Sequence, residues 1–192
     1  MLDDLLQRRP IIVVLAGPNG AGKSTFFNAH LTTAGLRFVN ADLLAREFAL
    51  DPQQAMAAAD ALRIELIRQG ESFVTKTVFS DPVGAKLSLL TQAMGQGYTV
   101  VLVYIGVSGP ERCDERVAMR VSQGGHDVPA DRLVARYPRT LANLQAALPL
   151  LSAVLVYDND DLLKPYRLVA KAVGGKVELM VTEVPAWWPR SP

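Results

Sequence analysis

The sequence predicts an α/β fold in which a mostly parallel central sheet is flanked by helices. Apolar runs that suit buried strands alternate with helical patterns along most of the chain, which is the order of elements found in parallel sheets. A glycine-rich segment joins the first apolar run to the first helical pattern. The chain has 192 residues, 49% hydrophobic and 20% charged. We therefore expect one globular domain over residues 1–192 with a sizeable core.

The expected strands are apolar and rich in β-branched residues, as buried parallel strands are. They are Ile11–Ala16, Leu36–Asn40, Ser72–Thr77, Tyr98–Ile105 and Ala153–Tyr157. Helical patterns cover Ser24–Leu31, a stretch from Leu43, Pro52–Gln69, Pro82–Gln96, Pro110–Ser122 and Ala130–Leu148, the last with a kink expected at Pro138. Asp51 is placed to cap the helix that begins at Pro52.

The end of the chain differs from this alternation. Tyr166–Ala172 and Lys176–Val184 flank Gly174-Gly175, which predicts a C-terminal β-hairpin. Trp187 and Trp188 follow among prolines, where we expect them to cover part of the core rather than to form a contact surface.

The glycine-rich segment matches the phosphate-binding P-loop, in which glycine, four residues and Gly-Lys-Ser follow a strand and open a helix. Its glycines let successive N–H groups point at phosphate oxygens. Lys23, expected to be exposed at the loop mouth, supplies a full charge, and the Ser24 hydroxyl supplies a ligand for Mg²⁺. We therefore expect a P-loop NTPase fold that binds ATP with Mg²⁺. The nucleotide-binding residues are Gly17, Pro18, Asn19, Gly20, Ala21, Gly22, Lys23, Ser24 and Thr25.

Bulk composition narrows the class of protein. The formal net charge of +1 argues against a dedicated nucleic-acid binder. Cys113 is the only cysteine, so an internal disulfide and a thiolate metal cluster are excluded, which fits a reducing cytoplasm. No apolar run approaches the roughly 20 residues of a membrane span. We expect a cytoplasmic protein that binds neither membranes nor nucleic acids.

Several absences favour a small-molecule kinase among P-loop proteins. Switch GTPases and motor ATPases need an acidic residue at the end of a neighbouring strand. The strand Tyr98–Ile105 instead leads into Gly106-Val107-Ser108-Gly109, and Asp158 follows only the last core strand. The guanine-specificity sequence Asn-Lys-x-Asp does not occur.

A kinase needs a group that accepts the proton of the attacking hydroxyl. Asp42 follows the strand Leu36–Asn40, which we expect to neighbour the P-loop strand, at the edge where open α/β sheets bind ligands. Asp42 is therefore a candidate general base. The competing interpretation is that Asp42 only caps the helix from Leu43, and spacing alone does not separate the two.

Three arginines share one face of a predicted helix. Arg112, Arg116 and Arg120 are spaced at i, i+4 and i+8, and only Arg112 has a nearby acidic partner, Glu115. Their mutual repulsion would turn into attraction around a bound triphosphate; the alternative is a solvated basic face. Gly124-Gly125 resembles a lid joint, and His126 is more simply a loop histidine.

Segments spread over residues 11–160 share a recognisable pattern: Gly17–Thr25, Asn40–Asp42, Thr77–Ser80, Arg116–Val121, Gly124–Pro129, Arg136-Tyr137, Asn143-Leu144 and Asp158-Asn159. Together they resemble the zeta-toxin family. The resemblance implies a P-loop kinase that transfers the γ-phosphate of ATP to the 3′-hydroxyl of UDP-N-acetylglucosamine. In toxin–antitoxin members this starves cell-wall synthesis, so an antitoxin protein is a candidate partner, although the chain is short for the family and has no obvious antitoxin segment.

Residue by residue, the resemblance implies that Lys23 and Ser24 hold phosphates and Mg²⁺ and that Asp42 is the general base. It also implies that Arg120 stabilises charge on the transferred phosphoryl group. Arg116 or Arg136 would be the second arginine, and the acceptor pocket would include Asp42, Lys76 and Thr77.

Lys76 departs from the family pattern, which usually has glutamate before Thr77. Three explanations compete: a different, more anionic acceptor, an impaired site, or a disarming substitution introduced for expression. The competing classes of function are a non-catalytic nucleotide-binding regulatory protein and a small ATPase or GTPase that acts on a protein partner.

Overall fold

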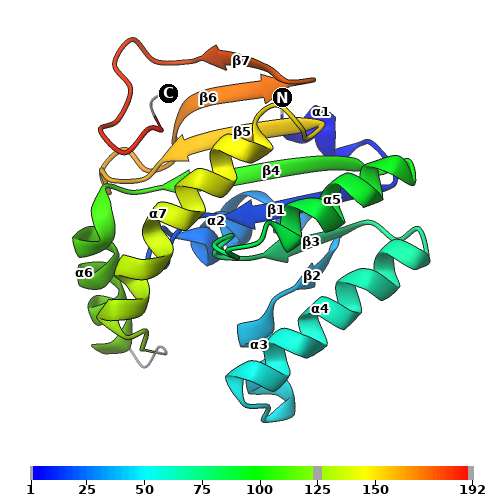
Figure 1. Cartoon of the computed structure of the whole chain (residues 1–192), viewed down its shortest axis with the longest axis horizontal. Coiled ribbons are helices and arrows are strands. Elements are labelled where there is room, and N and C mark those ends of the chain that lie inside the picture. Colours follow the sequence, from blue (N-terminus) through cyan, green and yellow to red (C-terminus); the bar gives the residue numbers. More distant parts are fainter. Residues whose placement is uncertain (1, 123–126, 190–192) are drawn as a thin grey trace.

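The computed structural model describes residues 2–122 and 127–189. Within them, a seven-stranded sheet has the order β2-β3-β1-β4-β5-β6-β7 (Figure 1). Neighbouring strands from β2 to β5 are parallel, and β6 and β7 are antiparallel additions at one edge. The predicted α/β fold is confirmed. The strands are β1 (Ile11–Ala16), β2 (Arg37–Val39), β3 (Phe73–Lys76), β4 (Thr99–Gly106), β5 (Ala153–Asp158), β6 (Arg167–Val173) and β7 (Lys176–Leu179).

The predicted helices begin and end close to the bounds expected from the sequence, and α1, which was not predicted, precedes β1. Asp51 caps α4 as predicted, because its carboxylate accepts hydrogen bonds from the backbone N–H groups of Gln53 and Gln54. The last long helix continues through Pro138. The helices are α1 (Leu2–Leu6), α2 (Lys23–His30), α3 (Ala41–Phe48), α4 (Pro52–Arg68), α5 (Ala85–Gly95), α6 (Gly109–Ser122) and α7 (Ala130–Ala147), with a 3-10 turn η1 (Thr32–Ala34).

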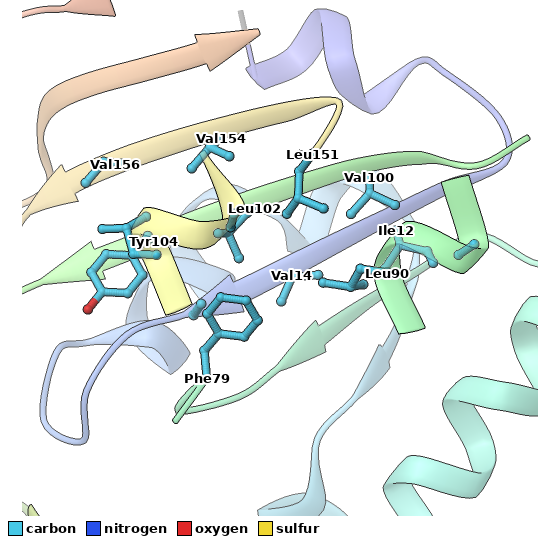
Figure 2. Close-up of a cluster of buried hydrophobic side chains, with 14 of the residues drawn as sticks. Ile12, Val14, Phe79, Leu90, Val100, Leu102, Tyr104, Leu151, Val154 and Val156 are labelled. Carbon is cyan, nitrogen blue, oxygen red and sulfur yellow. The ribbon is translucent and has the colours of Figure 1, made fainter. Parts of the chain in front are cut away.

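The core has two layers, one on each face of the sheet. Alternate residues of β1 point to opposite faces: Ile12 and Val14 pack with residues of α4, α5 and α7, whereas Ile11 and Val13 pack with residues of α1, α2 and α6. Figure 2 shows the first layer, which β4 and β5 complete with side chains such as Leu102. Because helices cover both faces, β1 is buried along its whole length and β4 at every residue after Thr99, so both can carry continuous apolar runs.

One expectation about strand order is wrong. The strand that leads to Asp42 does not neighbour the P-loop strand: β3 lies between them, paired with β1 from Ile12↔Phe73 to Leu15↔Lys76. The short β2, which begins at an exposed Arg37, forms the edge of the sheet instead. An exposed polar residue is tolerated at a sheet edge, whereas β3, whose first three residues are buried, suits the interior.

The C-terminal segment closes the opposite side of the sheet. β6 and β7 form the predicted hairpin, although its second strand ends at Leu179 rather than at Val184. Trp187 is only 6% exposed; it packs against Gly106 and Tyr104, and its indole N–H donates to the Asp158 carboxylate over 2.8 Å. Asp158 is thereby engaged in holding the chain end.

No helix in the described part of the chain is both long enough and apolar enough to cross a membrane.

Candidate active site

The P-loop leaves the carboxyl end of β1 and enters α2. Its three glycines have positive φ angles of 131°, 76° and 92° at Gly17, Gly20 and Gly22. Side chains there would also collide with neighbours: a Cβ atom at Gly17 would lie 2.0 Å from the Ile105 carbonyl oxygen. These three positions therefore suit glycine, and the loop backbone can approach a ligand closely there.

Lys23 is folded back onto the loop. Its ammonium donates to the carbonyl oxygens of Gly17 and Pro18 over 2.8 and 2.7 Å, and the residue is 8% exposed. The expectation of an exposed lysine is thus wrong, because two loop carbonyls give the ammonium partners inside the protein. Burial, reinforced by repulsion from Lys76, lowers the pKa of Lys23 to about 7.

Asn159 and Tyr166, which both follow β5 in the chain, support the P-loop through hydrogen bonds to its backbone. The Asn159 amide donates to the Ala21 carbonyl over 2.9 Å, and the Tyr166 hydroxyl donates to the Gly22 carbonyl over 3.0 Å. Asn159 is 4% exposed. Neither residue was predicted from the sequence to have a role in the site. The available signal was the position of Asn159, directly after a parallel strand at the ligand-binding edge of the sheet.

Asp42 lies in the first turn of α3, and its capping interpretation is wrong. The N-cap is Asn40, whose side-chain oxygen accepts a hydrogen bond from the Asp42 backbone N–H over 3.1 Å. The Asp42 carboxylate is consequently not engaged in capping, and its side chain is 64% exposed.

Lys76 connects Asp42 to the P-loop. Its ammonium donates to Asp42 Oδ2 over 2.6 Å and to Ser24 Oγ over 3.2 Å, and its side chain is 15% exposed. Burial alone would raise the pKa of Asp42, but attraction and hydrogen bonding from Lys76, with further attraction from Arg120 and Lys23, hold that pKa below its usual value. Asp42 is therefore ionised, and its basicity is reduced.

The end of β3 is fixed by neighbouring side chains. The Arg63 guanidinium, from α4, donates to Thr75 Oγ1 over 2.6 Å and also pairs with Asp60. Thr77, expected in the acceptor pocket, uses its hydroxyl to accept a hydrogen bond from the Phe79 backbone N–H over 3.0 Å. Thr77 therefore shapes the turn that follows Lys76.

The arginines of α6 and α7 take different positions. Arg116 lies against Gly20 and donates to the Asp160 carbonyl over 3.0 Å. Arg120 is near enough to influence the pKa of both Lys23 and Asp42. Arg136 instead influences the pKa of Lys86, at the start of α5. The expected pair between Arg112 and Glu115 is present, at 3.0 Å. Gly124, Gly125 and His126 lie outside the described residues.

Two oxygen atoms beside the P-loop are candidate ligands for Mg²⁺, the expected metal. Ser24 Oγ and Asp42 Oδ2 are hard oxygen ligands of the kind that Mg²⁺ prefers. Both, however, contact the Lys76 ammonium, and the described residues contain no cluster of three or more histidine, cysteine or acidic side chains that could hold a metal ion. With Lys76 in this position, these residues do not fit the metal.

Comparison with known proteins agrees with this architecture. The chain resembles the AvrRxo1-ORF1:AvrRxo1-ORF2 complex crystallised with sulphate ions, with a TM-score of 0.72, 18% identity, and coverage of 93% of this chain and 64% of that one. It also resembles the PezAT toxin–antitoxin system of Streptococcus pneumoniae (TM-score 0.59, 18% identity, 85% and 72% coverage). A third similar structure is a putative kinase from Chloroflexus aurantiacus (TM-score 0.51, 18% identity, 80% and 90% coverage).

The glycine-rich loop between β1 and α2 and the helix-flanked parallel sheet define a P-loop NTPase with a kinase-like fold. Residues 12–138 match the AAA_33 family of AAA domains, and the chain belongs to this family. The comparison with curated proteins found no match. The chain spans less than two thirds of the length of the first similar structure.

Proposed function

We propose that this chain, as one domain over residues 1–192, is an ATP-dependent kinase for a hydroxyl group of a sugar nucleotide of the UDP-N-acetylglucosamine class. The observation that carries the proposal is that an ionised carboxylate meets the P-loop: Asp42 Oδ2 and Ser24 Oγ lie 2.6 and 3.2 Å from one atom, Lys76 Nζ. A phosphate site beside a carboxylate at the carboxyl edge of a parallel sheet is what phosphoryl transfer to an alcohol requires.

Each residue has a defined part in the proposed reaction. The acceptor oxygen attacks the γ-phosphorus of ATP, its proton passes to Asp42, and the bond from the γ-phosphorus to the bridging oxygen breaks to release ADP. The P-loop N–H groups and Lys23 hold the phosphates. Arg120, with Arg116 as the second arginine, stabilises the negative charge on the transferred group. The proximity of Arg120 to Asp42 and Lys23 supports this assignment.

A second candidate acceptor is a more anionic compound. A carboxylate at position 76 could accept hydrogen bonds from sugar hydroxyls, whereas the Lys76 ammonium only donates them. Lys76 also weakens Asp42 as a base by lowering its pKa. These two observations favour either an acceptor that pairs with Lys76 or weak transfer to UDP-N-acetylglucosamine. If transfer were absent altogether, the protein would be a nucleotide-binding regulatory protein.

An acceptor screen with γ-labelled ATP tests the proposal, on the unaltered chain and on Lys76→Glu. For a sugar-nucleotide kinase, we expect weak labelling of UDP-N-acetylglucosamine and a gain on Lys76→Glu. For an anionic acceptor, labelling of that compound should be lost on Lys76→Glu. Robust labelling of the sugar nucleotide that Lys76→Glu leaves unchanged would remove position 76 from acceptor recognition. Absence of labelling by both variants, with ATP bound, would contradict a kinase.

The proposal extends to a toxin–antitoxin role. Two of the similar structures support it by their fold: the PezAT toxin–antitoxin system and the AvrRxo1 complex of two proteins. Expression of Lys76→Glu should arrest growth more strongly than expression of the unaltered chain, because the exchange restores the carboxylate typical of the resembled family. Equal growth with both, at equal protein levels, would contradict the toxin role.

A further inference from the structure

Lys76 occupies the point on which two oxygen ligands converge. Its Nζ atom lies 2.6 Å from Asp42 Oδ2 and 3.2 Å from Ser24 Oγ, and its side chain is 15% exposed although it ends at the mouth of the P-loop. The backbone on either side is anchored: the Thr77 N–H donates to the Leu15 carbonyl over 2.9 Å, and β3 pairs with β1 up to Lys76 itself. The position of this ammonium is thus built into the fold.

A divalent cation and this ammonium cannot share the two oxygens. Mg²⁺ lies about 2.0–2.1 Å from its oxygen ligands, so a cation on Asp42 Oδ2, which is 2.6 Å from Lys76 Nζ, would lie within about 4.7 Å of the ammonium nitrogen. Like charges so close together repel, and the Lys76 side chain, at 15% exposure, has little water to screen it. For Ser24 and Asp42 to hold a metal, Lys76 must leave, and both of its hydrogen bonds must break.

We propose that Lys76 is a resident cation, which competes with the divalent metal for Ser24 and Asp42 and so largely uncouples nucleotide binding from Mg²⁺. The loop mouth carries positive charge without a metal. Lys76 and Arg120 lie close enough to Lys23 to lower its pKa, and all three lower the pKa of Asp42, the opposing carboxylate. Such a site attracts a triphosphate by itself. This inference rests on the proposed function only for the binding of ATP, not for transfer.

The experiment measures ATP binding by calorimetry in excess EDTA and in excess Mg²⁺. For the unaltered protein, the two dissociation constants should agree within a few-fold. Lys76→Met keeps a long unbranched side chain, one atom shorter than lysine, but removes its charge. We expect it to bind ATP more weakly in EDTA and to improve about tenfold or more with Mg²⁺, as couplings between two ligands commonly amount to.

Reciprocity supplies a second readout that does not depend on activity. Electron paramagnetic resonance measures the affinity of the protein for Mn²⁺ with and without ATP, after correction for Mn²⁺ bound to free ATP. If metal and nucleotide are uncoupled in the unaltered protein, ATP should raise this affinity little. In Lys76→Met, ATP should raise it by the same factor by which the metal improves ATP binding in calorimetry. Lys176→Met, an exposed lysine on β7, is the matched control and should behave like the unaltered protein.

Two outcomes would overturn the inference, and they differ in what they leave of the proposed function. Mg²⁺-dependent ATP binding of equal strength in the unaltered protein and in Lys76→Met would overturn the resident cation while leaving the proposed kinase intact. Absence of ATP binding in every condition would overturn both. Thermal unfolding by circular dichroism monitors the fold of each variant, and Lys76→Gln, with the same predicted gain in Mg²⁺ dependence, replaces Lys76→Met if the latter does not fold.

Discussion

At the scale of single residues, the chemistry of this site depends on a small network of charges around the P-loop. Lys76 and Asp42 both act on the pKa of Lys23, and the two lysines both act on the pKa of Asp42. The network leaves one lysine with a pKa near neutrality and one carboxylate that is ionised but weakly basic. Both shifts follow from burial and from charges a few ångströms away, and both lead to measurable pH effects.

The binding of ATP should weaken as the pH rises above 7. Lys23 has a folded pKa of about 7, and a bound triphosphate would favour its charged form, so binding takes up a proton wherever free Lys23 is neutral. Calorimetry between about pH 7.5 and 9 should show affinity falling by up to about tenfold per pH unit, the limit for one proton. Lys23→Arg stays charged and should give a flat profile, whereas Lys23→Ala should abolish binding. A flat profile for the unaltered protein would contradict the lowered pKa.

The lowered pKa of Lys23 also makes the stability of the fold depend on pH. Because the folded pKa of Lys23 lies below its unfolded value of 10.5, the unfolded chain binds more protons between pH 7 and 10.5. The contribution of Lys23 to the free energy of unfolding therefore increases with pH across that window.

Asp42→Asn tests the general base. The amide introduced by this substitution would keep the shape of the side chain but would not take up the acceptor proton. We expect ATP affinity to stay nearly intact and transfer to fall by roughly 10²–10⁴-fold, the usual effect of losing a general base. The helix should remain stable, because Asn40 and not Asp42 is its N-cap. Unchanged transfer in a rapid-quench assay would remove Asp42 from the mechanism.

At the scale of elements, α6 delivers arginines to the P-loop while its other side is buried. Cys113 and Val117 anchor the helix in the core, at 1% exposure each. The start of the helix is fixed by Tyr137, whose hydroxyl donates to the Val107 carbonyl and accepts from the Gly109 N–H. This anchoring places Arg116 against Gly20.

Replacing Arg116 or Arg120 by alanine should lower the rate of transfer more than the affinity for ATP. The reason is that these arginines would stabilise the negative charge that develops on the transferred phosphoryl group in the transition state. Single-turnover kinetics combined with calorimetry separate the two effects. The matched control is Arg112→Ala on the same helix, since Arg112 is exposed and paired with Glu115; this variant should change neither. Equal losses in affinity and rate would mean that these arginines act only in ground-state binding.

At the scale of the whole molecule, the C-terminal segment packs against the ends of two strands of the sheet. Trp187 packs over Gly106 at the end of β4 and donates to Asp158 at the end of β5. A methyl group at position 106 would lie 2.3 Å from the Trp187 ring, so glycine is required there for this contact. The chain end therefore supports the two strands that lead into the loops beside the nucleotide site.

Trp187→Ala should lower the free energy of unfolding by about 3–5 kcal/mol, the usual range for a buried tryptophan. It also removes the indole donor from a mostly buried carboxylate. Trp188→Ala, at a partly buried neighbour, should cost less. Chemical denaturation monitored by circular dichroism measures both. Equal effects of the two substitutions would show that Trp187 has no special structural role.

The sequence by itself determined the class of fold and the nucleotide-binding loop. Both depend on local signals: apolar runs set strands, capping residues such as Asp51 set helix ends, and the spacing of glycines with Lys23 sets a phosphate-binding backbone. These signals act over a few residues, so they can be read without knowing the rest of the chain. The resemblance of scattered motifs to one kinase family also pointed to Asp42 and Lys76.

Only the tertiary structure decided which of these residues meet. Strand order placed β3 rather than β2 beside the P-loop strand, and that placement brought Lys76 onto Ser24 as well as Asp42. Likewise, the support of the P-loop by Asn159 and Tyr166 depends on contacts between residues 138 and 144 positions apart in the chain. Such contacts are set by the packing of two layers on a shared sheet, and local sequence patterns carry no information about which distant partner completes them.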